Sequence, residues 1–299
     1  METLSYQQRI SRVLRHIEQH LDERPDLDGL ARIACFSPYH FHRIFSAMVG
    51  ESVAAYVRRL LLERAAMQLG HSSESVTQIA LGSGYESVDA FSRAFRTHMG
   101  MLPSEYRRRK GHLEVARQRE MTKPLFYHEM PHCPPMDVQI KKFTPRLVAA
   151  VRHTGPYDES CPAWEKLCGV LGANGLLSGE SLAYGVSYDN PDITLPQKCR
   201  MDACVSLPPH LNRKSAELSA LEQHEEIILR QVGSEQEYAA MRVKGSYALL
   251  HPAYRSLFGM WFPQSGREPY DDPGFEIYWN SPHSTPEDEL LTEICIPLK

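Results

Sequence analysis

Two stretches of the chain, 50 residues apart, place arginine and other polar side chains at matching positions. Ser37, Phe41, Arg43, Phe45, Gly50, Tyr56, Arg58 and Arg59 match Ser87, Phe91, Arg93, Phe95, Gly100, Tyr106, Arg108 and Arg109 without a gap. Arginine carries a planar fork of donors that suits phosphate groups and the edge of guanine. The repeat therefore indicates a duplicated surface with the chemistry to bind nucleic acid, although solvated helix faces also use arginine.

Each stretch reads as an amphipathic helix with a polar face opposite an apolar stripe. The apolar stripe is Phe41, Ile44, Phe45 and Met48 in the first copy and Phe91, Ala94, Phe95 and His98 in the second. The opposite face carries Tyr39, His42, Arg43 and Ser46 in the first copy and Val88, Asp89, Ser92, Arg93 and Arg96 in the second. We expect the stripes to form core and the polar faces to be available to a partner.

Further helices must position these two faces. Apolar residues recur at helical spacing from Tyr6 to Leu21 and again after a turn at Pro25 and Asp26. Ser37 followed by Pro38 is typical of a helix start, because the hydroxyl caps backbone N–H groups and proline suits the first turn. A segment from Tyr56 to Leu69 predicts a helix long enough to hold the two copies at a fixed separation.

A second repeat, at an offset of 90 residues, fills the C-terminal half. Ala149, Ala150, Arg152, Gly155, Tyr157, Pro162, Ala163, Leu167 and Gly169 match Ala239, Ala240, Arg242, Gly245, Tyr247, Pro252, Ala253, Leu257 and Gly259. At the same offset Trp164 aligns with Tyr254, and Tyr188 and Asn190 match Tyr278 and Asn280. The pattern predicts an α+β domain of duplicated strand-helix-strand-strand units, with a cleft between them where small-molecule sites commonly form.

The chain is expected to form two domains, because 299 residues exceed the usual size of one. We place an all-α domain at residues 1–112, a linker at 113–135 and the α+β domain at 136–299, since residues 123–137 contain four prolines. Residues 1–120 carry 17 Lys and Arg against 14 Asp and Glu, whereas the remainder has a net charge of −7. The N-terminal half is thus the one that suits an anionic partner.

Other features disfavour several classes of protein. No apolar run of about 18 residues could span a bilayer and the first residues lack the apolar centre of a secretory signal, so we expect a cytoplasmic protein with no membrane partner. The seven cysteines are scattered without a CxxC pair, and no third ligand stands near His40 and His42. We therefore expect no disulfide framework, no metal site and no cofactor.

The second copy of the N-terminal repeat, IALGSGYESVDAFSRAFRTHMGMLPSEYRR from Ile79, resembles the AraC/XylS family of transcription regulators. The resemblance covers about residues 5–112 and implies two helix-turn-helix modules, joined by a long helix, that enter successive major-groove segments of double-stranded DNA. Val53 departs from the pattern where the second copy has Pro103. The resemblance implies recognition helices that start at Pro38 and near Val88, and the residues expected to contact DNA are Tyr39, His42, Arg43, Val88, Asp89, Ser92, Arg93 and Arg96.

The C-terminal half resembles the GyrI-like family, the effector-binding domain of Rob-type and BmrR-type regulators, in its VRHTGPY, MRVKGSY, EIYWN and TEICIPL segments. The resemblance implies a pocket for bulky, often cationic or aromatic compounds, with a buried acid on the last strand among aromatic rings. Glu293 matches that acid, and the walls would come from Trp164, Tyr188, Tyr278 and Trp279. The alternative is that these rings are ordinary core and that Glu293 is an exposed strand residue.

These features together predict a sequence-specific, DNA-binding transcription regulator that is modulated by a small cationic or aromatic effector and is not an enzyme. Activation is the expected mode, and repression stays open as the alternative. RNA polymerase is a further candidate partner. Two alternatives remain open. In the first, the C-terminal half is a GyrI-like hydrolase of bulky small molecules, in which Glu293 and a nearby tyrosine activate water. In the second, it is a ligand-free protein-interaction module fused to a DNA-binding domain.

Overall fold

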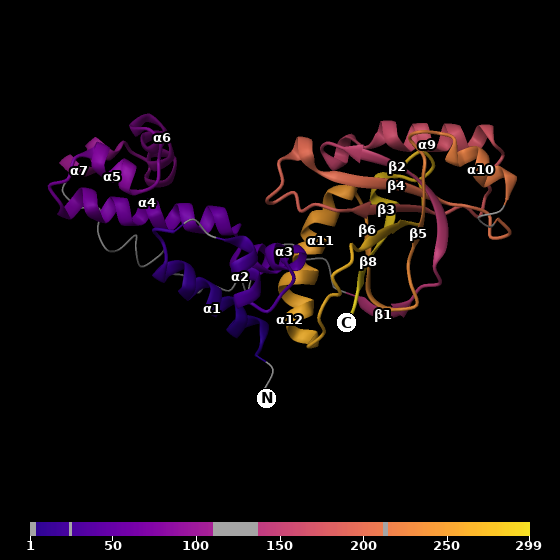
Figure 1. The fold of residues 1–299 in the computed structure, drawn as a ribbon, viewed down its shortest axis with the longest axis horizontal. Helices are drawn as coiled ribbons and strands as arrows, with labels where there is room; N and C mark the ends of the chain where they lie inside the picture. The colour runs from indigo at the N-terminus through magenta and orange to yellow at the C-terminus, as the bar shows by residue number, and fades with distance from the viewer. Residues whose placement is uncertain (1–3, 24–25, 110–136, 212–214) are drawn as a thin grey trace. The chain divides into compact units, whose positions relative to one another are not determined.

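The computed structural model describes residues 4–23, 26–109, 137–211 and 215–299. The chain separates into two compact units, residues 1–129 and 130–299, and each is described by itself (Figure 1). Within the described ranges every helix is too short or too polar to cross a bilayer.

The first unit is built from helices throughout its described residues. They are α1 (Tyr6–Gln19), α2 (Leu27–Ile33), α3 (Pro38–Val49), α4 (Val53–His71), α5 (Val76–Gly82), α6 (Val88–Met99) and α7 (Pro103–Arg108). The long helix α4 stands between two helix pairs, α2–α3 and α5–α6 (Figure 1). Phe91 and Phe95 of α6 are fully buried among side chains of α4 and α5. The predicted all-α, double helix-turn-helix domain is confirmed.

The same local signals mark the two ends of α3 and of α6, the second helix of each pair. The Ser37 hydroxyl accepts a hydrogen bond from the His40 backbone N–H at 3.4 Å, and the Ser87 hydroxyl accepts one from Ala90 at 3.2 Å. At the other end Gly50 and Gly100 adopt φ of 87° and 75°, the left-handed region that glycine enters without steric cost. The repeat in sequence is therefore a repeat of helix boundaries.

The second unit is an antiparallel sheet in the order β1-β6-β8-β7-β3-β4-β2-β5, with helices. Its strands are β1 (Val138–Lys142), β2 (Arg146–Thr154), β3 (Ala183–Ser187), β4 (Arg200–Ser206), β5 (Ile228–Val232), β6 (Glu237–Lys244), β7 (Phe275–Tyr278) and β8 (Leu291–Pro297). Its α-helices are α9 (Cys161–Ala173), α10 (Ala216–Glu222), α11 (Leu250–Ser256) and α12 (Phe262–Ser265). The predicted α+β class is confirmed.

Each repeat has one strand more than the sequence predicted. The additional strands β1 and β5 lie at the two edges of the sheet, and each precedes its repeat in the chain. Edge strands need only one partner and expose much of their surface, and β1 accordingly has no fully buried residue. The alternation of apolar and polar residues that marks a half-buried strand is therefore weak there.

The register of the sheet also corrects the alignment of the two repeats. Arg152 lies opposite Asp202 in the first repeat, and Arg242 lies opposite Glu293 in the second. The first strands are thus related by 90 residues, whereas the strand pairs that follow, β3–β4 and β7–β8, are related by 91. Tyr188 is therefore equivalent to Trp279, not to Tyr278 as predicted. A shift of one residue moves a side chain to the other face of a sheet.

The two faces of the sheet have different surroundings. On one face α9 packs on β2 and β4 around Leu167 and Leu171. The other face carries a cluster that includes Tyr184, Val186, Phe275, Ile277 and Cys295. Because side chains alternate along a strand, Gly185, Glu276 and Tyr278 point to the face that α9 covers.

Candidate functional site

The polar face of α6 is open to solvent. Asp89, Arg93 and Arg96 are exposed, and Val88 and Ser92 are half-buried. These are the residues predicted to contact DNA in the second copy. The apolar side of α6 anchors the helix through its two buried phenylalanines, so the exposed side presents two guanidinium groups on a fixed helix.

The polar face of α3 is less exposed. Tyr39 and His42 are half-buried, and Arg43 is 8% exposed in the full chain. The Arg43 guanidinium carbon lies 5.4 Å from the centroid of the Tyr39 ring, one turn earlier on the same helix. DNA contact by Arg43 stays a prediction.

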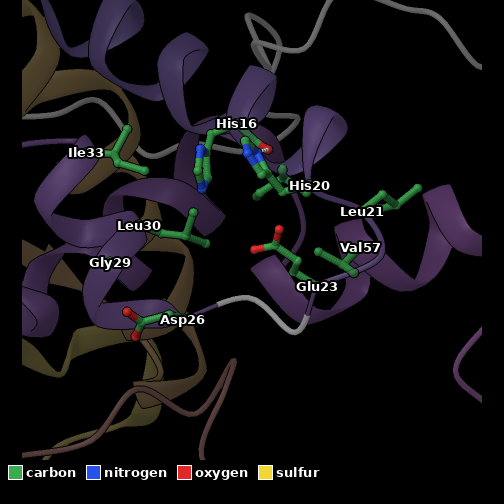
Figure 2. Close-up of a pocket in the computed structure, with 10 residues that line it drawn as sticks. His16, His20, Leu21, Glu23, Asp26, Gly29, Leu30, Ile33 and Val57 are labelled. Carbon is green, nitrogen blue, oxygen red and sulfur yellow. Dashed lines mark hydrogen bonds between the residues drawn. The ribbon is translucent and has the colours of Figure 1, made fainter.

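A cavity of about 150 Å³ lies in the first unit between the end of α1, the start of α2 and α4. Figure 2 shows the rings of His16 and His20 side by side, and their centroids are 4.2 Å apart. None of the residues predicted to contact DNA or an effector lines this cavity. It is also smaller than the roughly 300–1,000 Å³ of sites for drug-sized ligands.

In the second unit, a buried carboxylate stands among aromatic rings at Glu276 on β7. Glu276 is 6% exposed, and it accepts hydrogen bonds from the hydroxyls of Tyr278 at 2.5 Å and Tyr254 at 3.0 Å. The Tyr278 ring meets Trp164 edge-on at 5.6 Å and Tyr247 at 5.5 Å between centroids. We call Glu276 and these four rings the Glu276 cluster.

The Glu276 cluster takes its walls from both repeats. Trp164 belongs to α9, Tyr254 to α11, and Tyr278 to the central strand β7. Gly185 on the neighbouring strand β3 leaves room for the Tyr278 hydroxyl, which a Cβ there would approach to 2.5 Å. Trp164 is half-buried and Tyr247 is 38% exposed, so the cluster reaches the surface through these two rings.

The charge state of the Glu276 cluster follows from its surroundings. Burial raises the pKa of Tyr278 well above its ordinary value, and the neighbouring Glu276 carboxylate raises it further. Burial also raises the pKa of Tyr247. Both phenols are therefore neutral near pH 7, and Tyr278 remains a hydrogen-bond donor to Glu276.

The structure does not bring the five predicted ligand residues into one site. Trp164 and Tyr278 belong to the Glu276 cluster. Tyr188 donates a hydrogen bond to Asp202 at 2.6 Å, on the opposite face of the sheet. Glu293 is buried as expected, at 1% exposure, but it pairs with Lys141 on that opposite face. Trp279 is 41% exposed, and the centroid of its ring lies 5.9 Å from the guanidinium carbon of Arg242.

Glu276, Tyr247 and Tyr254 were missed by the sequence reasoning. A signal was available, because Glu276 and Tyr278 stand two positions apart in the EIYWN segment. Residues two apart in a strand share a face. The prediction that the Tyr278 ring lines a site therefore also predicts that Glu276 lies beside it on the same face. The assignment of the acid to the last strand instead came from the resemblance alone.

Comparison with known proteins matches this architecture. Residues 136–299 match the GyrI-like small molecule binding domain family, and residues 30–109 match a helix-turn-helix domain family. Over 106 residues the chain is 31% identical to the regulatory protein SoxS of Salmonella typhimurium, covering 36% of this chain and 99% of SoxS. The chain belongs to the AraC-type regulators and ends in a GyrI-like domain. It is a DNA-binding transcription regulator, and its second unit is of a small-molecule-binding family.

Two other similar proteins bear on how far this likeness extends. The HTH-type transcriptional regulator YbfP of Bacillus subtilis is 37% identical over 102 residues, which are 34% of this chain and 35% of YbfP. A hydrolase from Listeria innocua has a similar structure over 56% of this chain and 94% of its own, with 12% identity and a TM-score of 0.42. A likeness at that level carries no argument for catalysis by the GyrI-like domain.

Proposed function

We propose that this AraC-type regulator reads double-stranded DNA through α3 and α6 and responds to an aromatic cation held at the Glu276 cluster. The observation that carries the second part is one buried carboxylate ringed by four aromatic side chains from both repeats. We further propose that the protein acts in the cytoplasm as an activator that contacts RNA polymerase, and that it is not an enzyme.

Exposed cations on an anchored helix support the DNA-reading role of α6. Arg93 and Arg96 are exposed on the side of α6 opposite its buried phenylalanines. A guanidinium can pair with guanine O6 and N7 in the major groove, and Asp89 can accept from cytosine N4. We assign the same role, by the repeat, to Tyr39, His42 and Arg43 on α3.

Replacement of Arg93 by alanine tests the DNA-reading role. If Arg93 holds a base edge, the Arg93→Ala variant should lose about 1–3 kcal/mol of specific binding and relax its preference at that base pair. Binding sites would first be selected from genomic fragments at about 0.15 M salt, because affinity for DNA depends on salt. Arg12→Ala, which removes an exposed arginine from α1, is the matched control. Equal loss on specific and random DNA would instead make Arg93 a phosphate contact.

The chemistry of the Glu276 cluster favours a delocalised cation. Aromatic faces attract cations by about 0.5–2 kcal/mol each, with the larger values at desolvated sites. The Glu276 carboxylate adds a negative charge in a largely buried setting, where attraction to a cation is screened less than in water. A flat or propeller-shaped aromatic cation that enters beside Trp164 and Tyr247 would gain both the attraction of the aromatic faces and that of the Glu276 carboxylate.

Paired ions of opposite charge and equal shape test this ligand class. Tetraphenylphosphonium should raise the melting temperature of the wild-type protein, and tetraphenylborate should not. Glu276→Gln should weaken the response to the cation at least tenfold, whereas Glu289→Gln, an exposed site on the same unit, should not. Equal responses to the two ions would reject the proposal. No response to either would favour the ligand-free interaction module, and product formation would favour a hydrolase.

A further inference from the structure

Two buried carboxylates occupy equivalent positions on the face of the sheet opposite Glu276. Asp202 on β4 and Glu293 on β8 are each 1% exposed, and the strand register relates them by the approximate twofold of the duplication. We call Asp202 with Arg152, Tyr188 and Arg230 the Asp202 cluster. The Glu293 cluster consists of the equivalent residues Arg242, Trp279 and Lys141 with Glu293.

In the Asp202 cluster, three donors satisfy both carboxylate oxygens. Arg152 donates from two of its nitrogens, one to each oxygen, and Arg230 donates to Oδ2 at 2.7 Å. The Tyr188 hydroxyl donates to the same Oδ2 at 2.6 Å. The Tyr188 ring also lies 4.5 Å from the Arg152 guanidinium carbon, so a phenol both bonds to the acid and packs on the cation.

In the Glu293 cluster, one of these donors is absent. Lys141 at 2.5 Å and Arg242 at 3.4 Å both approach Oε1 of Glu293. Trp279 stands where the first repeat has Tyr188, and Oε2 of Glu293 is buried without a hydrogen-bond partner. A buried acceptor left unpaired costs roughly 1–3 kcal/mol, and more when it is charged. The second repeat thus keeps the carboxylate and its cations but lacks the phenol.

We propose that the Glu293 cluster binds a small phenol, whose hydroxyl donates to Glu293 Oε2 and whose ring lies against the Arg242 guanidinium. The first repeat supplies the template, since Tyr188 makes both contacts within the chain. A neutral donor suits the site better than a cation, because Lys141 and Arg242 already place two positive charges beside one carboxylate.

The rim of the Glu293 cluster is accessible. The side chains of Lys141 and Arg242 are 27% and 54% exposed, and Trp279 is 41% exposed. To reach Glu293 Oε2, a phenol would have to displace these partly exposed side chains. The site is separate from the Glu276 cluster, because Glu276 and Tyr278 point to the other face of the sheet.

Phenol itself is the probe, and anisole, which has the same ring but no hydroxyl proton, is its control. Phenol should stabilise the wild-type protein against heat at concentrations at which anisole does not. It should also shift the indole N–H resonance of Trp279 in a ¹⁵N NMR spectrum. Equal effects of phenol and anisole, or an unchanged Trp279 resonance, would overturn the proposal.

Substitutions that exchange the two repeats make the test specific. Trp279→Tyr should supply the absent donor from within, raise the melting temperature and weaken phenol binding about tenfold or more. Tyr188→Ala should remove both the ring that packs on Arg152 and the hydroxyl that donates to Asp202, so phenol should stabilise this variant more than it stabilises the wild type. A Trp279→Tyr variant that keeps the full phenol response would refute the proposal, as would a Tyr188→Ala variant that gains none. The tetraphenylphosphonium response should persist in Trp279→Tyr. Failure of the phenol proposal at the Glu293 cluster can therefore be distinguished from failure of the cation proposal at the Glu276 cluster.

Discussion

At the scale of single residues, the buried carboxylates of the second unit depend on the donors placed around them. Although burial opposes the charged form of Asp202, hydrogen bonds from Arg152, Tyr188 and Arg230 lower its pKa below the ordinary value. The donor set therefore outweighs desolvation. Arg152 and Arg230 would be left with uncompensated positive charge if the carboxylate were removed, because both remain cationic.

The Asp202→Asn variant should therefore lose about 3 kcal/mol of unfolding free energy at pH 7. Because the folded pKa is lowered, the stabilisation is present above the unfolded pKa of about 3.9 and is lost as pH falls through the folded pKa. The gap between wild type and variant should consequently narrow below about pH 4. Denaturant unfolding of both proteins at a series of pH values measures this difference in unfolding free energy. Asp158→Asn, at an exposed aspartate, is the control. A gap that does not change with pH would contradict this account.

At the scale of elements, the start of α6 controls the position of the DNA-reading side chains. The Ser87 hydroxyl caps the helix one residue before Val88, and Asp89 in the first turn complements the positive end of the helix dipole. Arg93 and Arg96 lie one and two turns further along. Fraying of the first turn would displace Val88 and Asp89 first.

Replacement of Ser87 by alanine should cost about 1 kcal/mol of unfolding free energy in the first unit, because an N-cap acceptor is lost. DNA affinity should fall as well, since part of the binding energy must then order the helix. Thermal unfolding and DNA titration of the same samples measure both effects. Ser104→Ala, an exposed serine on α7, is the control, and equal behaviour of the two variants would exclude a capping role.

At the scale of the whole molecule, both units are duplications, and this accounts for how much the sequence could predict. The N-terminal repeat has no gap, so its helix bounds, its buried phenylalanines and the exposed face of α6 all followed from one alignment. The fold class of the second unit followed in the same way, because the strand, glycine and helix pattern recurs there too.

The candidate ligand site was less predictable, for a geometric reason. One additional residue in the second repeat, between β6 and β7, changes the offset from 90 to 91. In a helix this shift rotates a side chain by part of a turn, but in a strand it reverses the face. Tyr188 and Tyr278 therefore lie on opposite faces of the sheet, and Glu293 lies on the face opposite Trp164 and Tyr278. Pairing between strands distant in the chain, which fixes the faces, is not visible in the sequence.

The two edge strands of the sheet pair across the two repeats. β1 precedes the first repeat but pairs with β6 of the second, whereas β5 precedes the second repeat and pairs with β2 of the first. Each half of the sheet is therefore completed by a strand from outside its own repeat (Figure 1). An ancestor encoding one repeat would have met this requirement as a homodimer whose subunits exchanged their leading strands. Fusion of two such genes would then turn a contact between subunits into the centre of a single domain.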